Sequence, residues 1–200
     1  MRVAIIDYKM GNVASVQKAL NFLKIENIIS YNEEVIRQAD CIILPGVGSF
    51  KQGMENLEML GLIDILNEEV IVNKKPFLGI CLGMQLIAEY GTEPIHCNGL
   101  GWIKGTVIKM QEEGKRIPHL GWNTIKAKTN SFIENFQEDF YFIHSYHFKV
   151  ENPKNIAATV NYGNDYVAAI HKENIYATQF HPEKSQTVGL DLLKYFFSNA

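Results

Sequence analysis

Residues 76–85 read Pro-Phe-Leu-Gly-Ile-Cys-Leu-Gly-Met-Gln, which places one cysteine between two glycines where an apolar, strand-like stretch meets a helix-like one. This pattern predicts a sharp strand-to-helix turn, because Gly79 and Gly83 leave room in a crowded backbone. The thiol of Cys81 would stand at the carboxyl end of a sheet and at a helix N-terminus, where the helix dipole favours the reactive thiolate. We therefore expect a nucleophile, the alternative being a buried cysteine at an ordinary strand–helix junction.

Residues 176–185 form a second strand-like run that ends in polar residues, Tyr-Ala-Thr-Gln-Phe-His-Pro-Glu-Lys-Ser. His181 and Glu183 are the pair that a cysteine nucleophile requires, since an imidazole takes and returns a proton and a carboxylate holds its tautomer. Pro182 fixes the backbone between them. A His-x-Glu sequence is a weak signal by itself in a chain with six histidines, so its weight comes from the combination with Cys81.

Short apolar runs alternate with helical periodicity in the first half of the chain, which is typical of a parallel sheet covered by helices. We expect strands over residues 3–6, 28–30, 41–44 and 77–80, helices over 12–23 and 187–198, and one or two helices over 54–72. Between residues 101 and 171 we expect strands closed by turns, over 104–110, 122–127 and 141–143, which would add antiparallel pairs at the sheet's edge. The predicted fold class is α/β, with three layers: an open, mostly parallel sheet with helices on both faces and an added antiparallel portion.

In such a sheet the active residues gather at the carboxyl ends of the strands. Cys81 and His181 each follow an expected strand, and Pro-Gly-Val-Gly at residues 45–48 follows a third. The glycines invite a phosphate-cradle interpretation, but the segment lacks the lysine and the spacing of a P-loop. A tight strand-to-helix turn is the structural alternative.

Composition predicts one domain, residues 1–200, because this length with 46% hydrophobic residues suffices for one α/β core. A formal net charge of −3 and a pI near 6.1 give no electrostatic reason to expect nucleic acid or anionic membrane as a partner. Residues 1–7 read as a first strand and no run is apolar enough to span a bilayer, so a cytoplasmic location is expected. Cys41, Cys81 and Cys97 lack paired spacing, which predicts neither disulfides nor a zinc site.

The segments 79–85 and 179–183 resemble the two signatures of class I, triad-type glutamine amidotransferases, whose fold is flavodoxin-like. Further segments resemble the glutaminase subunits of imidazole glycerol phosphate synthases along essentially the whole chain. They are Asp-Tyr (7–8), Gly-Asn (11–12), Ser-Val (15–16), Leu-Pro-Gly-Val-Gly-Ser-Phe (44–50), Pro-His-Leu-Gly-Trp-Asn (118–123), Tyr-Phe-Ile-His-Ser-Tyr (141–146) and Glu-Lys-Ser-Gln (183–186). That all of these segments occur in the right order makes chance agreement implausible.

The resemblance implies hydrolysis of glutamine to glutamate and ammonia by a triad of Cys81, His181 and Glu183. It implies an oxyanion hole from the backbone N–H groups of Val47 and Leu82, which the flanking glycines would allow to form only when partner and substrate are bound. The residues that it places in the glutamine pocket are Gly48, Gln85, Ser145 and Tyr146. Their alternatives are structural: Gln85 as a helix surface residue, and Ser145 and Tyr146 as strand-edge residues. No cofactor or metal is implied.

The resemblance also implies a partner, because ammonia at neutral pH is mostly protonated and a protected passage keeps it nucleophilic. The partner of these glutaminases is a (β/α)-barrel cyclase subunit, with which they form a heterodimer. It uses the ammonia to make imidazole glycerol phosphate and aminoimidazole carboxamide ribotide for histidine biosynthesis. Candidate interface residues are Asn12, Trp122, Tyr141 and Lys184. Asn12 has the alternative role of a helix N-cap, and Trp122 that of a core residue.

Three stretches depart from the pattern of the histidine-pathway subunits: residues 93–98, residues 102–105 and His147. They leave room for a paralogous subunit that supplies ammonia to a surface-polysaccharide sugar pathway. A non-catalytic binding protein is a second alternative, which the intact triad disfavours. A cysteine hydrolase of other amides is a third, which Gln85 and residues 145–146 disfavour. His96, Cys97 and His119 could together suggest a metal site, which their scattered positions in loops disfavour.

Overall fold

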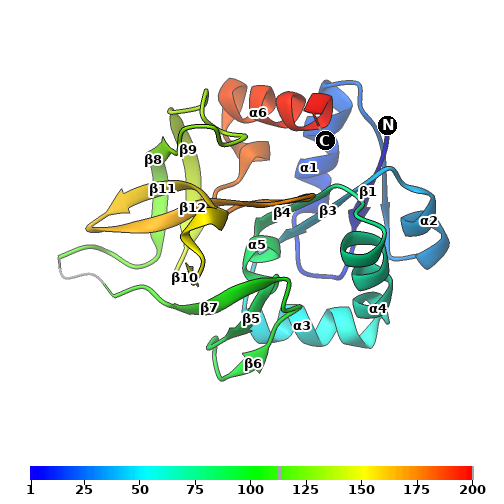
Figure 1. The fold of residues 1–200 in the computed structure, drawn as a ribbon, viewed down its shortest axis with the longest axis horizontal. Helices are drawn as coiled ribbons and strands as arrows, with labels where there is room; N and C mark the ends of the chain where they lie inside the picture. The colour runs from blue at the N-terminus through cyan, green and yellow to red at the C-terminus, as the bar shows by residue number, and fades with distance from the viewer. Residues whose placement is uncertain (112–113, 200) are drawn as a thin grey trace.

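The computed structural model describes residues 1–111 and 114–199, in which nine strands form one sheet between two layers of helices (Figure 1). The strand order is β2-β1-β3-β4-β13-β12-β11-β8-β9. Its parallel part comprises β1 (Arg2–Ile6), β2 (Glu26–Ser30), β3 (Cys41–Gly46), β4 (Phe77–Cys81) and β13 (Ile175–Thr178). Its antiparallel part comprises β12 (Asn164–Lys172), β11 (Ile156–Tyr162), β8 (His119–Ala127) and β9 (Asp139–His144). The predicted three-layer α/β class is confirmed.

The helices divide between the two faces of the sheet, as Figure 1 shows. One face carries α1 (Val13–Phe22) and α6 (Gln186–Asn199), and the other carries α3 (Phe50–Met59), α4 (Leu62–Leu66) and α5 (Leu82–Leu86). Strand β1 shows why both faces are covered, since Val3 and Ile5 pack toward α1 and α6 while Ala4 and Ile6 pack toward the opposite helices. The remaining helical elements are α2 (Glu33–Gln38), a π-helix (Asn67–Val72) and two 3₁₀ turns (Pro153–Asn155 and Pro182–Lys184).

A second sheet corrects one expectation. The strand predicted over residues 104–110 is β7 (Ile103–Lys109), and it does not extend the edge of the main sheet. It pairs with β10 (Tyr146–Val150) and β5 (Ala88–Gly91), and β6 (Cys97–Asn98) completes the order β10-β7-β5-β6. The prediction was wrong because alternating polarity identifies a half-buried strand without identifying its partner.

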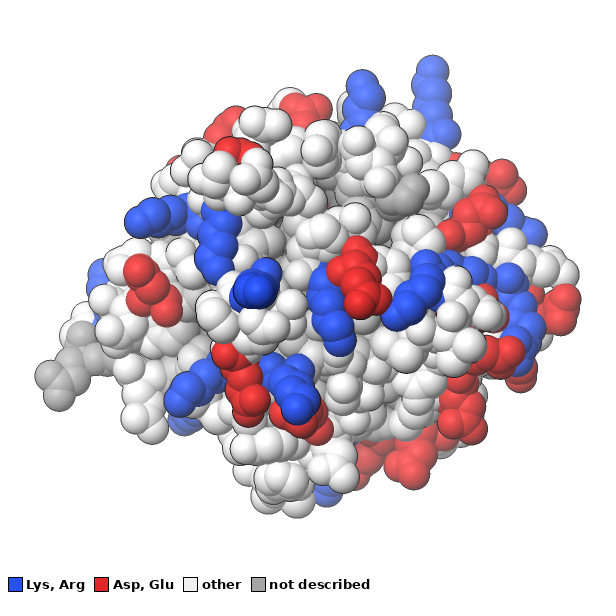
Figure 2. All heavy atoms as spheres, viewed as in Figure 1, with Lys and Arg blue, Asp and Glu red and all other residues white. Residues whose placement is uncertain are grey.

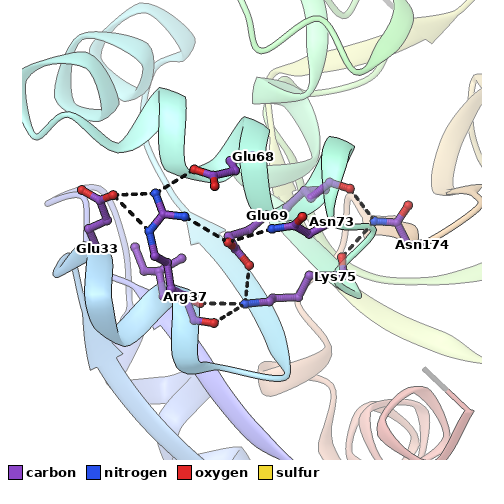
Figure 3. Close-up of polar contacts among 9 residues, drawn as sticks. Glu33, Arg37, Glu68, Glu69, Asn73, Lys75 and Asn174 are labelled. Atoms are coloured by element: carbon purple, nitrogen blue, oxygen red, sulfur yellow. Dashed lines mark hydrogen bonds and ion pairs between the residues drawn. The ribbon is translucent and has the colours of Figure 1, made fainter.

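An ion-pair cluster fixes the amino ends of the strands, away from the ends that carry Cys81 and His181 (Figure 3). Glu69, only 4% exposed, accepts from Lys75 Nζ at 2.6 Å and lies 3.5 Å from Arg37 Nη1. Lys75 also donates to the carbonyl oxygens of Ile36 and Arg37, which joins α2 to the loop that precedes β4. The cluster therefore ties three segments together with its buried charges paired.

Charged side chains are distributed unevenly over the face shown in Figure 2. Acidic residues gather along the edge formed by α2, α3 and α4, whereas lysines and arginines elsewhere on this face are interspersed with acidic residues. None of the helices in residues 1–111 and 114–199 combines the length and the apolar character that crossing a bilayer requires.

Candidate active site

Cys81 stands on a strained turn between β4 and α5. It has φ of 54°, a value that few residues other than glycine adopt, and it is 5% exposed. A Cβ on Gly83 would lie 1.7 Å from the Leu44 carbonyl oxygen, and one on Gly79 would lie 2.8 Å from the Gly83 carbonyl oxygen. The two glycines are therefore required by close packing, as the sequence predicted, and the strained turn holds the sulfur at the carboxyl end of β4.

His181, the candidate base, follows β13, the strand that neighbours β4. β13 runs parallel to β4 with Thr178 opposite Ile80, so the residues that follow each strand emerge side by side. His181 Nδ1 lies 2.7 Å from Glu183 Oε1, and both side chains are 2% exposed. Because a carboxylate only accepts, His181 donates from Nδ1 and its Nε2 is left to exchange protons. That Nε2 is buried with no hydrogen-bond partner among the described residues.

The electrostatics of His181 favour its charged form. Burial by itself would lower its pKa, but the Cys81 sulfur and the Glu183 carboxylate outweigh burial and raise the pKa of His181 to about 10. At neutral pH the ring is therefore an imidazolium beside the sulfur. An imidazolium next to a cysteine is the arrangement that supports a thiolate nucleophile.

A cavity of about 350 Å³ opens in front of Cys81. It brings together the residues expected in the glutamine pocket and the oxyanion hole, namely Val47, Gly48, Leu82, Gln85, Ser145 and Tyr146. Gln85 is 4% exposed, so its alternative role as a helix surface residue is wrong. Glu93, from the segment that departs from the histidine-pathway pattern, also lines the cavity, and burial raises the pKa of its carboxyl above the usual range.

The expected oxyanion donor is engaged elsewhere. The Val47 N–H donates to the Met10 carbonyl oxygen at 2.7 Å, so it is not free to bind a substrate oxygen. Gly48 has φ of +111°, a conformation that favours glycine. A Cβ on Gly46 would lie 2.0 Å from the Tyr8 hydroxyl, whose oxygen is buried without a hydrogen-bond partner among the described residues. The hydrogen bond from Val47 to Met10 and the close packing at Gly46 thus hold the segment in this conformation.

The candidate interface residues occupy different positions around this site. Trp122 and Tyr141 face each other across β8 and β9 with ring centroids 6.0 Å apart, and Trp122 is 46% exposed, so its alternative role in the core is wrong. Lys184 is half-buried in the 3₁₀ turn that follows His181. Asn12 is exposed, and its Oδ1 accepts from the Ser15 N–H at 3.2 Å, which confirms its role as the N-cap of α1.

Several polar residues at the site were missed by the sequence analysis. The Ser185 hydroxyl donates to the His181 carbonyl oxygen at 2.6 Å and accepts from the Tyr141 N–H at 3.0 Å, which ties β9 to the loop that carries His181. Gln179 donates to the Cys81 sulfur at 3.7 Å. Ser185 and Gln179 both lie in the segments that carried the resemblance, so their position was available in the sequence although their contacts were not.

His119 and His144 form a buried pair beside the cavity, with His119 Nδ1 3.2 Å from His144 Nε2. Burial lowers the pKa of His119 to about 4 and is the main reason that the pKa of His144 falls to about 3. The weak metal site of His96, Cys97 and His119 is not formed, since the described part of the chain holds no cluster of three His, Cys, Asp or Glu side chains suited to a metal.

Comparison with known proteins identifies the family. The family model of class-I glutamine amidotransferases matches residues 4–200. The imidazole glycerol phosphate synthase subunit HisH 1 of Campylobacter jejuni strain 81-176 is 48% identical over 198 residues, 97% of this chain and 98% of that protein. The subunit HisH 2 of Methanococcus maripaludis strain S2 is 46% identical over 202 residues, 99% of this chain and 100% of that protein.

Solved structures agree with the fold. A crystal structure titled glutamine amidotransferase has a TM-score of 0.77 at 20% identity, covering 98% of this chain and 97% of that chain. The PurLQS structure from Thermotoga maritima has a TM-score of 0.74 at 16% identity, with 98% and 97% covered. At such low identity these structures support the architecture alone. The family match over residues 4–200 and the relatives at 46–48% identity show that this chain belongs to the class I glutamine amidotransferase family.

Proposed function

We propose that this chain is the glutaminase subunit of an imidazole glycerol phosphate synthase and that Cys81, His181 and Glu183 hydrolyse glutamine. The relatives that carry this name match nearly the whole chain at 39–48% identity. The observation that carries the chemistry is the His181–Glu183 pair at 2.7 Å, which follows the strand next to that of Cys81, with His181 Nε2 lacking a hydrogen-bond partner among the described residues. In this proposal residues 1–200 act as one domain, in the cytoplasm.

The reaction proceeds through a thioester. The Cys81 thiolate attacks the carboxamide carbon of glutamine, and His181 donates its Nε2 proton to the departing amide nitrogen, which leaves as ammonia. His181, now neutral, takes a proton from water, and the resulting hydroxide attacks the thioester carbon. Glutamate is released, and the Cys81 thiolate and the His181 imidazolium are restored. Glu183 accepts from Nδ1 throughout, which keeps Nε2 as the group that exchanges protons.

The cavity suits the α-amino acid end of glutamine. Gln85 uses its amide nitrogen on the Tyr146 carbonyl oxygen and on Gln179 Oε1, each at 3.0 Å, which leaves its carbonyl oxygen as the group available to a ligand. Glu93 adds a carboxylate to the lining. Both groups favour the cationic α-ammonium of a substrate, and Gly48 and Ser145 complete the proposed pocket with Tyr146.

The oxyanion hole forms in this proposal when the Gly46–Val47 peptide rotates. The Val47 N–H must leave the Met10 carbonyl oxygen before it can join the Leu82 N–H at the tetrahedral oxygen. Partner binding supplies the free energy for this change. The amide NMR signal of Val47 reports the rotation of this peptide. A large chemical-shift change is expected on addition of the barrel subunit and its nucleotide ligand. An unchanged signal in an active complex would refute the rotation.

The proposed partner is a (β/α)-barrel cyclase subunit that binds over the mouth of the site and receives the ammonia. Two exposed apolar residues, Val47 and Ile143, line the cavity, and two more, Leu120 and Trp122, are exposed on β8, the strand paired with that of Ile143. Leu120 pairs with Ile143 in the β8–β9 register, so these two side chains share one face. An apolar surface rimmed by polar residues such as Asn12 and Lys184 is typical of a protein–protein interface.

The decisive experiment measures glutamate and ammonia release from glutamine by wild type and Cys81→Ala, each alone and with the barrel cyclase subunit and its nucleotide ligand. Turnover that depends on the partner and vanishes in Cys81→Ala is expected. Activity that survives Cys81→Ala would refute the nucleophile. A wild type that stays silent with this partner would favour a paralogous subunit with another acceptor. The second candidate is considered because two separately numbered HisH proteins of one organism, Methanococcus maripaludis, both match this chain.

A further inference from the structure

A fully buried amide, that of Gln179, contacts the sulfur of the proposed nucleophile. Its backbone N–H donates to the Ala168 carbonyl oxygen at 2.8 Å, which anchors the residue to β12 just beyond the end of β13. Its side-chain Nε2 lies 3.7 Å from the Cys81 sulfur, and its Oε1 lies 3.0 Å from Gln85 Nε2. The amide therefore bridges the nucleophile and a residue of the proposed glutamine pocket.

The contacts of Gln85 fix which end of the Gln179 amide faces the sulfur. Gln85 lies 3.0 Å from the Tyr146 carbonyl oxygen, which only accepts, so the atom at that position must be the Gln85 nitrogen. The same nitrogen faces Gln179, whose nearer atom must then be its oxygen. The remaining end of the Gln179 amide, directed at Cys81, is consequently the N–H donor.

The histidine pair holds the Tyr146 carbonyl from its other side. His144 Nδ1 lies 2.9 Å from this oxygen and must donate to it, so His144 Nε2 accepts from His119 Nδ1. His119 Nε2 in turn accepts from Asn123 Nδ2, which also donates to the Asn161 carbonyl oxygen at 2.9 Å. In this series of hydrogen bonds each donor has an acceptor when both imidazole rings are neutral. The donors then all point the same way, from Asn123 on β8 toward the Tyr146 carbonyl oxygen.

We propose that Gln179 is a further catalytic residue, whose amide N–H stabilises the Cys81 thiolate while Gln85, the Tyr146 carbonyl and the His119–His144 pair keep the amide turned toward the sulfur. The proposal rests on the proposed role of Cys81 as the nucleophile. The sulfur carries its negative charge before attack and again when glutamate leaves, but not in the thioester. A donor on the sulfur therefore favours the attacking thiolate and its departure in the second step.

Two near-isosteric variants separate the donor from the shape of the side chain. Gln179→Glu keeps an acceptor for Gln85 but replaces the donor on Cys81 by an oxygen, and Gln179→Met removes both polar ends without adding charge. The other titratable groups that face the sulfur, Tyr8 and His181 with Glu183 behind it, are the same in all variants. Differences in the reactivity of Cys81 then report the lost N–H.

The readout is the rate of Cys81 alkylation by iodoacetamide across pH, with turnover in the complex with the barrel subunit. Both variants are expected to react about tenfold more slowly at neutral pH, since a hydrogen bond to a charged group contributes on that order. Their pH profiles are expected to move to higher pH, and kcat to fall by about tenfold with KM changed by less than about twofold.

Asn174→Asp is the matched control, because it also converts a well-packed amide to an acid. Asn174 donates to the Val70 and Lys75 carbonyl oxygens at the amino ends of the strands, away from Cys81 (Figure 3). Its alkylation profile is expected to match wild type even where its melting temperature falls.

Wild-type alkylation profiles in Gln179→Met and Gln179→Glu would overturn the proposal. This outcome is distinct from a failure of the proposed function. If Cys81→Ala is silent and both Gln179 variants behave as wild type, the role of Gln179 alone is refuted. If Cys81→Ala retains turnover, the nucleophile itself is wrong and the role of Gln179 fails with it.

Discussion

Acidification is expected to destabilise this protein through one buried histidine. His144 is 6% exposed, with its Nδ1–H on the Tyr146 carbonyl oxygen and its Nε2 against His119. Burial, with smaller effects from His119, His147 and His181, lowers the pKa of His144 to about 3 from its ordinary value of 6.5. Because the folded pKa lies below the unfolded one, the contribution is complete above pH 6.5 and is lost as the pH falls toward 3.

The size of the effect follows from proton uptake. Below pH 6.5 the unfolded chain binds close to one proton at this position that the folded chain does not bind. Each pH unit then costs about 1.4 kcal/mol of unfolding free energy, so lowering the pH from 6.5 to 5 costs about 2 kcal/mol through His144. His119, with its pKa lowered in the same direction, adds to the loss.

Urea unfolding of wild type and His144→Asn at pH 7 and pH 5 isolates the loss of unfolding free energy that is due to His144. Asparagine keeps a donor for the Tyr146 carbonyl oxygen but has no group that titrates in this range, and the carboxylates common to both proteins cancel in the comparison. Wild type is expected to lose about 2 kcal/mol more than the variant between the two pH values. Equal losses would show that His144 binds its proton in the folded protein, and would refute the neutral pair.

Two further predictions concern stability. Tyr8→Phe is expected to raise the unfolding free energy by about 1 kcal/mol, because the Tyr8 hydroxyl is buried with no hydrogen-bond partner among the described residues; a lower midpoint in urea would contradict this. Glu69→Gln is expected to lower the unfolding free energy by about 3 kcal/mol, because Lys75, whose side chain is 11% exposed, keeps its charge beside an uncharged partner. A thermal denaturation curve unchanged from wild type would show that the cluster in Figure 3 contributes nothing.

The central sheet was predictable because its strands are buried on both faces. The apolar runs at 3–6, 41–44 and 77–80 correspond to β1, β3 and β4 within one or two residues at each end. The edge strand β2 begins two residues before its prediction, at Glu26, where a polar side chain on a less covered strand hides the pattern. Short α2 was not predicted, since Ile36 alone of its six residues is buried and one apolar residue shows no period.

The parts of the candidate site that were predictable are those formed by residues adjacent in the sequence. Residues 79–83 specify the turn at Cys81, and residues 181–183 specify the imidazole and carboxylate that pair. The contacts of Gln179 and the histidine pair depend on register. His119 lies opposite His144 only because β8 and β9 pair as they do, and a shift by one residue would turn one ring to the other face. Polarity along a single strand carries no information about that register.

The position of β13 in the sheet has a consequence for how the protein becomes active during synthesis. β13 lies between β4 and β12, so a strand made after residue 174 must insert beside one completed at residue 81. Contacts between segments so distant in sequence slow folding, because the loop that joins them must close first. The same insertion brings His181, the proposed base, next to Cys81, the proposed nucleophile. A nascent chain therefore carries Cys81 for almost a hundred residues of elongation without His181, and the proposed hydrolysis of glutamine cannot begin until the sheet is complete.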